Sequence, residues 1–129
     1  MSGPTQLYID YLVQEGFRPS TDSDGDVTFK AEGKYYYIDI DASDAGYFRL
    51  VFPNFWPIER DEELVKAVLA ANYATMMTKV AKVYVRRDGK NVVASIELFL
   101  GRPEYFRDVF QRAMRALNTS VEHFREKMI

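Results

Sequence analysis

Hydrophobic and polar residues alternate along three neighbouring segments between residues 27 and 52. Alternation with a period of two places one face of a β-sheet in the core and leaves the other face wetter. Turn-forming residues separate the segments, at Glu32-Gly33-Lys34 and at residues 42–46. The pattern therefore predicts an antiparallel meander whose apolar face is covered by helices. The predicted inward positions are Val27, Phe29, Ala31, Tyr36, Ile38, Ile40, Phe48, Leu50 and Phe52.

Amphipathic helices are predicted at both ends of the chain. The first begins at Pro4-Thr5 and ends at Gly16, with Phe17 as the apolar contact that follows a glycine C-cap. The last follows Gly101-Arg102-Pro103, and its apolar residues recur every three or four positions, as on one face of a helix. These residues are Phe106, Phe110, Ala113, Leu117, Val121, Phe124 and Met128.

A middle helix is predicted to begin near residues 59–61, where acidic residues suit the positive end of the helix dipole. Most of its circumference is apolar or small, which is typical of a helix that contacts the sheet on one side and another surface on the other. Its larger residues are Leu64, Val65, Val68, Leu69, Asn72, Tyr73, Met76, Met77 and Val80, and its opposite side carries Ala67, Ala70, Ala71 and Ala74.

A hairpin is predicted between the second and third helices. Residues 81–87 alternate, Asp88-Gly89 is a strong turn signal, and residues 92–100 alternate again. The order is therefore α-β-β-β-α-β-β-α, which predicts an α+β fold with an antiparallel five-stranded sheet packed against helices. We expect one domain over residues 1–129, because no repeat or linker interrupts the pattern.

Composition agrees with a folded domain, since 47% of the residues are hydrophobic and 15% are aromatic. The chain has no cysteine, which excludes disulfides and thiolate chemistry. No apolar run approaches the roughly 20 residues that span a bilayer. The first residues also lack the basic and apolar regions of a signal peptide. We therefore expect a soluble cytoplasmic protein that does not act at a membrane.

Charge is unevenly divided along the chain, with 13 acidic and 5 basic residues in 1–65 and 6 acidic and 12 basic residues in 66–129. This division is compatible with two differently charged faces, with attraction between copies, or with charges that interleave once the chain folds.

Candidate chemistry is sparse. Residues 22–26 resemble the start of a calcium loop, but Val27 and Gly33 stand where such a loop needs glycine and glutamate. His123 is the single histidine, and a zinc site needs several nitrogen or sulfur ligands. Glu97 lies mid-strand on the wetter face, where we expect it to be solubilising. Basic residues in the last helix alternate with acidic ones, which is typical of a solvated face rather than a nucleic-acid site. We expect no enzyme activity, metal or cofactor.

Several stretches carry a resemblance to a known family: Tyr11-Leu12-Val13-Gln14-Glu15-Gly16-Phe17, Asp24-Gly25-Asp26-Val27-Thr28-Phe29, Phe48-Arg49-Leu50-Val51-Phe52-Pro53 and Ala70-Ala71-Asn72. Together with the order of elements, they make the chain similar to the YbjN-like family, whose fold resembles that of the type III secretion chaperones. The resemblance covers nearly the whole chain. It implies an α/β sandwich-like domain, often a homodimer, that binds protein segments or serves regulation, and it carries no catalytic residues.

The leading hypothesis is a non-catalytic, chaperone-like or regulatory module that presents a hydrophobic groove to a segment of a partner protein, as a homodimer. Aromatic residues are enriched at protein interfaces, and the partner-binding candidates are Phe55, Trp56, Tyr73, Tyr84 and Phe99. Small residues allow helices to approach closely, and the dimer candidates are Ala67, Ala71 and Ala74. The alternative is a small-ligand sensor with an apolar pocket between helix and sheet.

Overall fold

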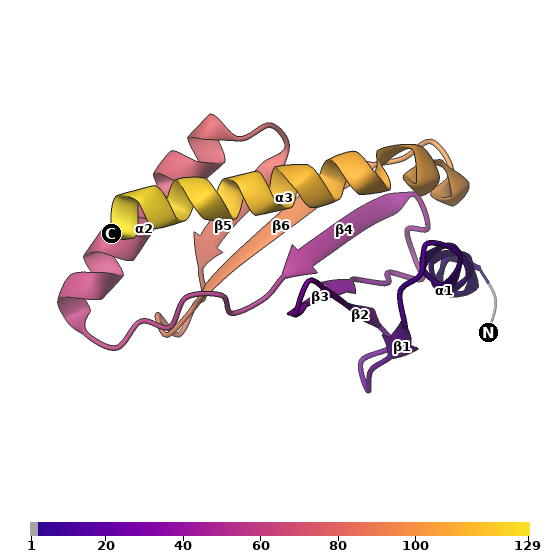
Figure 1. The fold of residues 1–129 in the computed structure, drawn as a ribbon, viewed down its shortest axis with the longest axis horizontal. Helices are drawn as coiled ribbons and strands as arrows, with labels where there is room; N and C mark the ends of the chain where they lie inside the picture. Colours follow the sequence, from indigo (N-terminus) through magenta and orange to yellow (C-terminus); the bar gives the residue numbers. More distant parts are fainter. Residues whose placement is uncertain (1–2) are drawn as a thin grey trace.

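The computed structural model describes residues 3–129 and contains one six-stranded antiparallel sheet with the strand order β1-β2-β3-β4-β6-β5. Helices lie against one face of the sheet, and the other face is open (Figure 1). The elements are α1 (Pro4–Gln14), β1 (Ser20–Thr21), β2 (Val27–Ala31), β3 (Lys34–Ile38), β4 (Tyr47–Phe52), α2 (Asp61–Met77), β5 (Ala81–Val85), β6 (Val92–Phe99), the 3-10 turn η1 (Pro103–Tyr105) and α3 (Phe106–Met128).

The α+β class and the order of the predicted elements are confirmed, with one strand more than expected. The additional strand is β1, which has two residues and pairs Ser20 with Thr28 and Thr21 with Val27. It lies in a segment that the sequence pattern assigned to a polar connector. Two residues are too few to show an alternating pattern, so periodicity could not reveal this strand.

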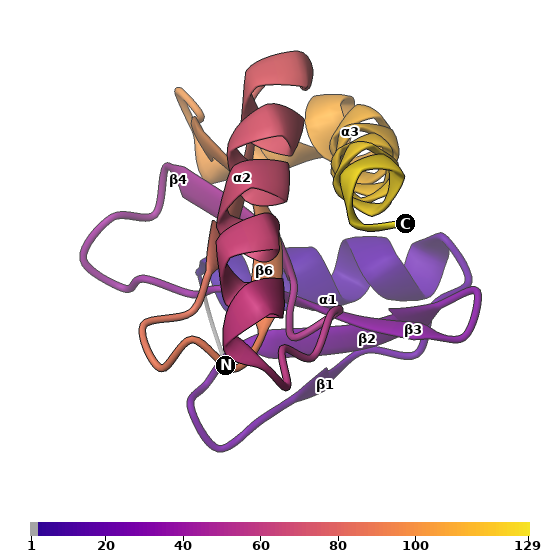
Figure 2. The same ribbon diagram turned by 90° about the vertical axis from the view of Figure 1, so that its left-hand side faces the viewer.

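The turn after α1 carries the predicted glycine cap. Gly16 has a φ of 93°, and its N–H donates to the Val13 carbonyl, while the Phe17 N–H donates to the Leu12 carbonyl. This pair of bonds closes the helix end, and the left-handed conformation at Gly16 has no steric cost for glycine. Phe17 then packs on Phe29 of β2, with ring centroids 5.3 Å apart, and so fixes α1 over the first strands of the meander (Figure 2).

The long helix α3 crosses the sheet and joins the two other helices to it (Figure 1). Every residue of its predicted apolar stripe is buried. Near its start, the Phe106 ring stands edge-on to Tyr8 of α1, with centroids 4.5 Å apart. Its last turns lie beside α2 (Figure 2), so the C-terminal end of α3 packs against α2.

The helix α2 lies beside β5, the strand at one edge of the sheet. The Thr75 hydroxyl accepts a hydrogen bond from the Val83 N–H at 2.9 Å and donates one to the Val83 carbonyl at 3.1 Å. These backbone groups point away from β6. Because Thr75 satisfies both of them, α2 blocks the part of the β5 edge where another strand could pair.

Candidate functional site

The outer side of α2 is an exposed apolar surface. Leu69 is 66% exposed and Met76 is 68% exposed, although residues of these types are usually buried. Contiguous exposed apolar patches on a protein surface mark sites of interaction. We define the α2 surface as the residues of this side, which recur three or four positions apart: Val65, Val68, Leu69, Asn72 and Met76.

The alanine side of α2, assigned from sequence to contact between copies, is buried inside the chain. Ala67, Ala71 and Ala74 are at most 4% exposed, because α2 packs on α3 and β5 through this side. Small side chains let the helix approach α3 closely, as expected, but the neighbouring element belongs to the same chain. Their burial leaves these alanines no free surface for a second copy, and the α2 surface lies on the opposite side of the helix.

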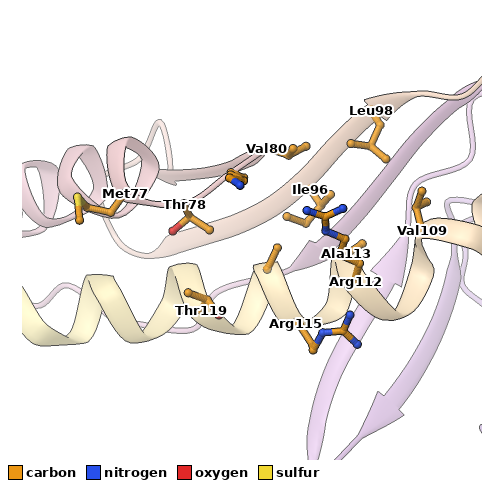
Figure 3. A pocket seen from close by; sticks show the side chains of 12 residues that line it. Met77, Thr78, Val80, Ile96, Leu98, Val109, Arg112, Ala113, Arg115 and Thr119 are labelled. Carbon is orange, nitrogen blue, oxygen red and sulfur yellow. The ribbon is translucent and has the colours of Figure 1, made fainter.

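A groove lies between the end of α2, strand β6 and α3, with a volume of about 480 Å³ (Figure 3). Ile96 and Leu98 line it from β6, and Val109 and Ala113 line it from α3. Met77 also lines the groove, is half-exposed and directly follows Met76, so the groove begins next to the C-terminal end of the α2 surface.

The charged residues that line this groove are all basic: Lys79, Arg112 and Arg115. The opposite end of the α2 surface is acidic. Asp61 and Glu62 lie one turn before Val65 and continue its side of the helix. The exposed apolar surface therefore runs from an acidic end at the start of α2 to a basic end at the groove.

The edge of β6 is open beside the groove. Strand β5 pairs with β6 only as far as Ala81 opposite Ile96, whereas β4 pairs with β6 as far as Phe99. Before Ala81 the chain turns away at Val80, which has a φ of 67°. Such a φ is a genuine outlier for a β-branched residue, and strained residues of this kind cluster at functional sites.

The five aromatic candidates are not brought together. Phe55 and Trp56 pack on Phe124 of α3, with ring centroids 5.3 Å and 5.6 Å away, and so fill the core beside the crossover. Phe99 is the exception among the candidates, since it is 84% exposed at the open edge of β6.

Tyr73 and Tyr84 are half-buried and lie on opposite sides of the sheet. Tyr73 faces α3, where its ring stands edge-on to His123 and the Lys127 ammonium lies 4.4 Å from its centroid. The Tyr84 hydroxyl accepts a hydrogen bond from Arg49 on the open sheet face. Both side chains take part in contacts within the chain.

The open face of the sheet holds a charged cluster around Glu97, a residue expected from sequence to be merely solubilising. The Glu97 carboxylate accepts hydrogen bonds from the Tyr47 hydroxyl at 2.5 Å, the Ser95 hydroxyl at 2.8 Å and the Lys82 ammonium at 3.0 Å. Arg49 lies 3.3 Å from it and also pairs with Asp39 at 3.0 Å. The side chain of Glu97 is only 18% exposed.

The pKa values in this cluster favour ionised Glu97, neutral Tyr47 and charged Arg49. Burial by itself raises the pKa of Glu97, but the hydrogen bonds from Tyr47, Ser95 and Lys82 outweigh it and lower that pKa to about 2. Burial, together with the same hydrogen bond, raises the pKa of Tyr47 to about 12. Burial lowers the pKa of Arg49, yet hydrogen bonding to Tyr37 and nearby negative charge leave it above its usual value. Groups held this firmly in one protonation state are poor acid–base catalysts near neutral pH.

His123 lies on α3 with its Nδ1 atom 3.7 Å from the Glu126 carboxylate, beyond hydrogen-bond distance. Its neighbours are the Tyr73 ring and an i+3 carboxylate, which do not form a nucleophile–base arrangement.

The acidic turn at Asp22, Asp24 and Asp26 brings three carboxylates within 4.8 Å of one another. Two of these carboxylates already have partners within the chain, because Asp22 accepts from the Asp24 and Asp26 N–H groups and Asp26 accepts from the Ile40 N–H. The turn is therefore explained as a connection between β1 and β2. Among residues 3–129, no helix is both long and apolar enough to cross a membrane.

Comparison with known proteins relates the chain to a family and to solved structures. The chain is similar over 98% of its length to a crystal structure of an uncharacterized protein from Methanothermobacter thermautotrophicus, of which it covers 99%, with a TM-score of 0.61 and 10% sequence identity. At this identity the likeness shows a shared fold. No curated protein matches the sequence. The family model for YbjN, described as "Putative bacterial sensory transduction regulator", matches residues 9–129. The chain therefore belongs to the YbjN family.

Proposed function

We propose that this YbjN-family protein is a non-catalytic regulatory module that forms a homodimer through the α2 surface and binds a partner protein segment in the adjoining groove. The observation that carries the proposal is the exposed apolar side of α2, on which Leu69 and Met76 are each about two-thirds exposed. Surfaces of this kind are stabilised when a protein partner covers them. The firmly ionised state of Glu97 supports a structural rather than a catalytic role for the open sheet face.

A second copy is the occupant that best fits the α2 surface. In a two-fold symmetric contact the same surface faces itself, and two helices related by the axis can run antiparallel. Such a pairing brings the acidic start of one α2, at Asp61 and Glu62, near the basic residues at the other end, Lys79 and Arg112. The charge difference along the surface therefore favours antiparallel over parallel pairing. It also agrees with the attraction between copies that is one interpretation of the charge division along the chain.

The matched variants Val65→Glu and Val13→Glu test this proposal. Both residues are exposed valines on helices, at 63% and 59%, but Val13 lies on α1, away from the α2 surface. We expect the wild type and Val13→Glu to sediment as dimers of the 15.0 kDa chain and Val65→Glu to sediment as a monomer. A monomeric wild type, or equal behaviour of the two variants, would contradict the proposal.

The burial of Ala71 provides a further control. A glutamate at this position would place an unpaired charge on the buried side of α2, and burying a charge without a partner is strongly unfavourable. Ala71→Glu should therefore lose helical circular dichroism, whereas Val65→Glu should retain it. This comparison separates a loss of the dimer from a loss of the fold.

A small-ligand sensor is the second candidate function, and the volume of the groove favours it. A site of about 480 Å³ between helix and sheet lies within the range of small-molecule pockets. A ligand that binds only the folded protein raises its melting temperature. Thermal-shift screening of the Val65→Glu monomer with anionic metabolites would support the sensor if saturable shifts appear and if Arg112→Glu abolishes them.

A further inference from the structure

We propose that the groove binds an extended, acidic segment of a partner protein, which adds a strand to the sheet at the β6 edge between Glu97 and Phe99. The inference rests on the proposed function and specifies how the partner segment is held. The added strand rests on the β6 edge and the dimer on the α2 surface, and the Val65→Glu monomer allows the two to be tested separately.

The backbone geometry of β6 supports strand addition. In an antiparallel pair, successive residues direct their N–H and C=O groups alternately to one neighbour and the other. Val83 points its backbone groups toward Thr75 and away from β6, so Lys82 and its partner Ser95 point toward each other. Two and four residues further along β6, Glu97 and Phe99 point in the same direction as Ser95, where residues 3–129 place no strand beside them.

The turn at Val80 keeps this edge open. If the chain continued in an extended conformation before Ala81, its next residues would lie beside Glu97 and Leu98. Instead Val80 takes the left-handed conformation, with a φ of 67°, and directs the chain back into α2. The strain therefore coincides with a free edge of the sheet, and unpaired edge strands are templates for strand pairing.

The groove beside the edge fits alternate side chains of an added strand. Leu98 and Ile96 face α3, as do the apolar residues at the corresponding positions of neighbouring strands. A strand beside β6 would direct every second side chain to this same side, onto Leu98, Val109 and Ala113. Phe99 lies on the other side of the sheet and is free to cover the remaining side chains of the segment.

The basic residues of the groove indicate the charge of the segment that it binds. Lys79, Arg112 and Arg115 line the groove, and no acidic residue is among the residues that line it. Carboxylates at the ends or outer positions of a bound segment would lie near these basic side chains, whereas a basic segment would be repelled. The expected ligand therefore alternates apolar residues and has a net negative charge.

Selection from displayed random peptides of about twelve residues tests whether the bound segment is acidic and alternates apolar residues. The Val65→Glu protein serves as bait, so that an α2-mediated dimer does not influence the result. We expect selected peptides to be rich in Asp and Glu and to alternate apolar residues. The double variant Arg112→Glu with Arg115→Glu should bind a synthetic copy of a selected peptide with an affinity lower by about tenfold or more. The matched reversal of two exposed basic residues outside the groove, Arg18→Glu with Arg87→Glu, should leave its affinity unchanged.

Hydrogen exchange tests the mode of binding. With the synthetic peptide bound, the amides of Glu97 and Phe99 should exchange about tenfold or more slowly. A peptide with proline at its central position lacks one backbone donor and should give little protection. Selected peptides without acidic enrichment, or protection confined to α2, would overturn the inference while leaving the homodimer intact. Saturable binding of decanoate at Arg112 without selection of any peptide would also overturn it and would favour a lipid ligand.

Discussion

Protonation of Glu97 should remove a large part of the stability of the open-face cluster. The unperturbed pKa of Glu97 is 4.5 and its folded-state pKa is about 2. A difference of one pKa unit corresponds to 1.36 kcal/mol, so the carboxylate contributes about 3 kcal/mol to the free energy of unfolding at neutral pH. Because the folded pKa is the lower one, this contribution is present above the unfolded pKa and is lost as the pH falls from about 4.5 to about 2.

The variant Glu97→Gln is a neutral isostere that mimics the protonated state. We expect the free energy of unfolding to be about 3 kcal/mol lower than that of the wild type above pH 5, about 1 kcal/mol lower near pH 3, and nearly equal at pH 2. Urea unfolding followed by circular dichroism at each pH measures this difference. All other titrating groups, including Asp26 with its raised pKa, are common to both proteins, so their contributions to the difference in free energy of unfolding largely cancel.

Glu59→Gln is the matched control, since Glu59 is exposed and lies outside the cluster. It should change the free energy of unfolding by less than about 0.5 kcal/mol at every pH. The reasoning would be refuted if, at pH 7, Glu97→Gln lowered the free energy of unfolding by no more than this control does. It would also be refuted if the cost of Glu97→Gln did not depend on pH between 5 and 2.

Three further variants test other contacts. The pKa of Tyr47 is raised from 10 to about 12, so its contribution to the free energy of unfolding is complete below pH 10 and is lost as the pH rises toward 12. Between these pH values the free energy of unfolding, measured with urea, should therefore fall less for Tyr47→Phe than for the wild type. Val80→Gly should relieve the backbone strain and raise the free energy of unfolding by about 1 kcal/mol, and a lower melting temperature would contradict this. Thr75→Val should cost about 1–3 kcal/mol, because it leaves the backbone groups of Val83 unsatisfied, and an unchanged urea midpoint would argue against that role.

Elements with a single strong period were predictable from sequence. The alternating strands and the stripe on α3 each have one apolar side and one polar side, so the pattern itself decides which side is buried. Phe106, Phe110 and Leu117 are accordingly buried with no measurable exposure. The order of the elements, and with it the fold class, follows from these periods and from the turn residues between them.

The middle helix was misinterpreted because both of its sides are apolar. Larger residues such as Leu69 gain more from burial than alanine does, which favours burying them if one helix is considered alone. The structure buries Ala67 and Ala71 instead, because close packing on α3 and β5 leaves room only for small side chains. Recurrence of alanine at helical spacing was the signal of this close contact, and the larger residues of the helix are the ones left exposed.

The groove and the open edge depend on distances between elements that are remote in sequence. The predicted strand at residues 92–100 was longer than the one at 81–87, which indicates that part of it has no partner in the hairpin. The turn at Asp88-Gly89 places this excess at the far end of the strand, but sequence could not show that the chain before Ala81 leaves it unpaired, since that depends on the turn at Val80. The cluster around Glu97 was missed for a similar reason, because its donors come from strands β4, β5 and β6.

The most direct test of the proposed dimer is oxidative cross-linking of single-cysteine variants, which is clean because the chain contains no cysteine. In an antiparallel pairing about the middle of the α2 surface, position 65 of one copy lies near position 76 of the other. We expect a mixture of Val65→Cys and Met76→Cys proteins to form disulfide-linked heterodimers, while each variant alone forms few. Cross-links no more frequent in the mixture than in either variant alone would contradict the central claim that two copies meet through the outer side of α2.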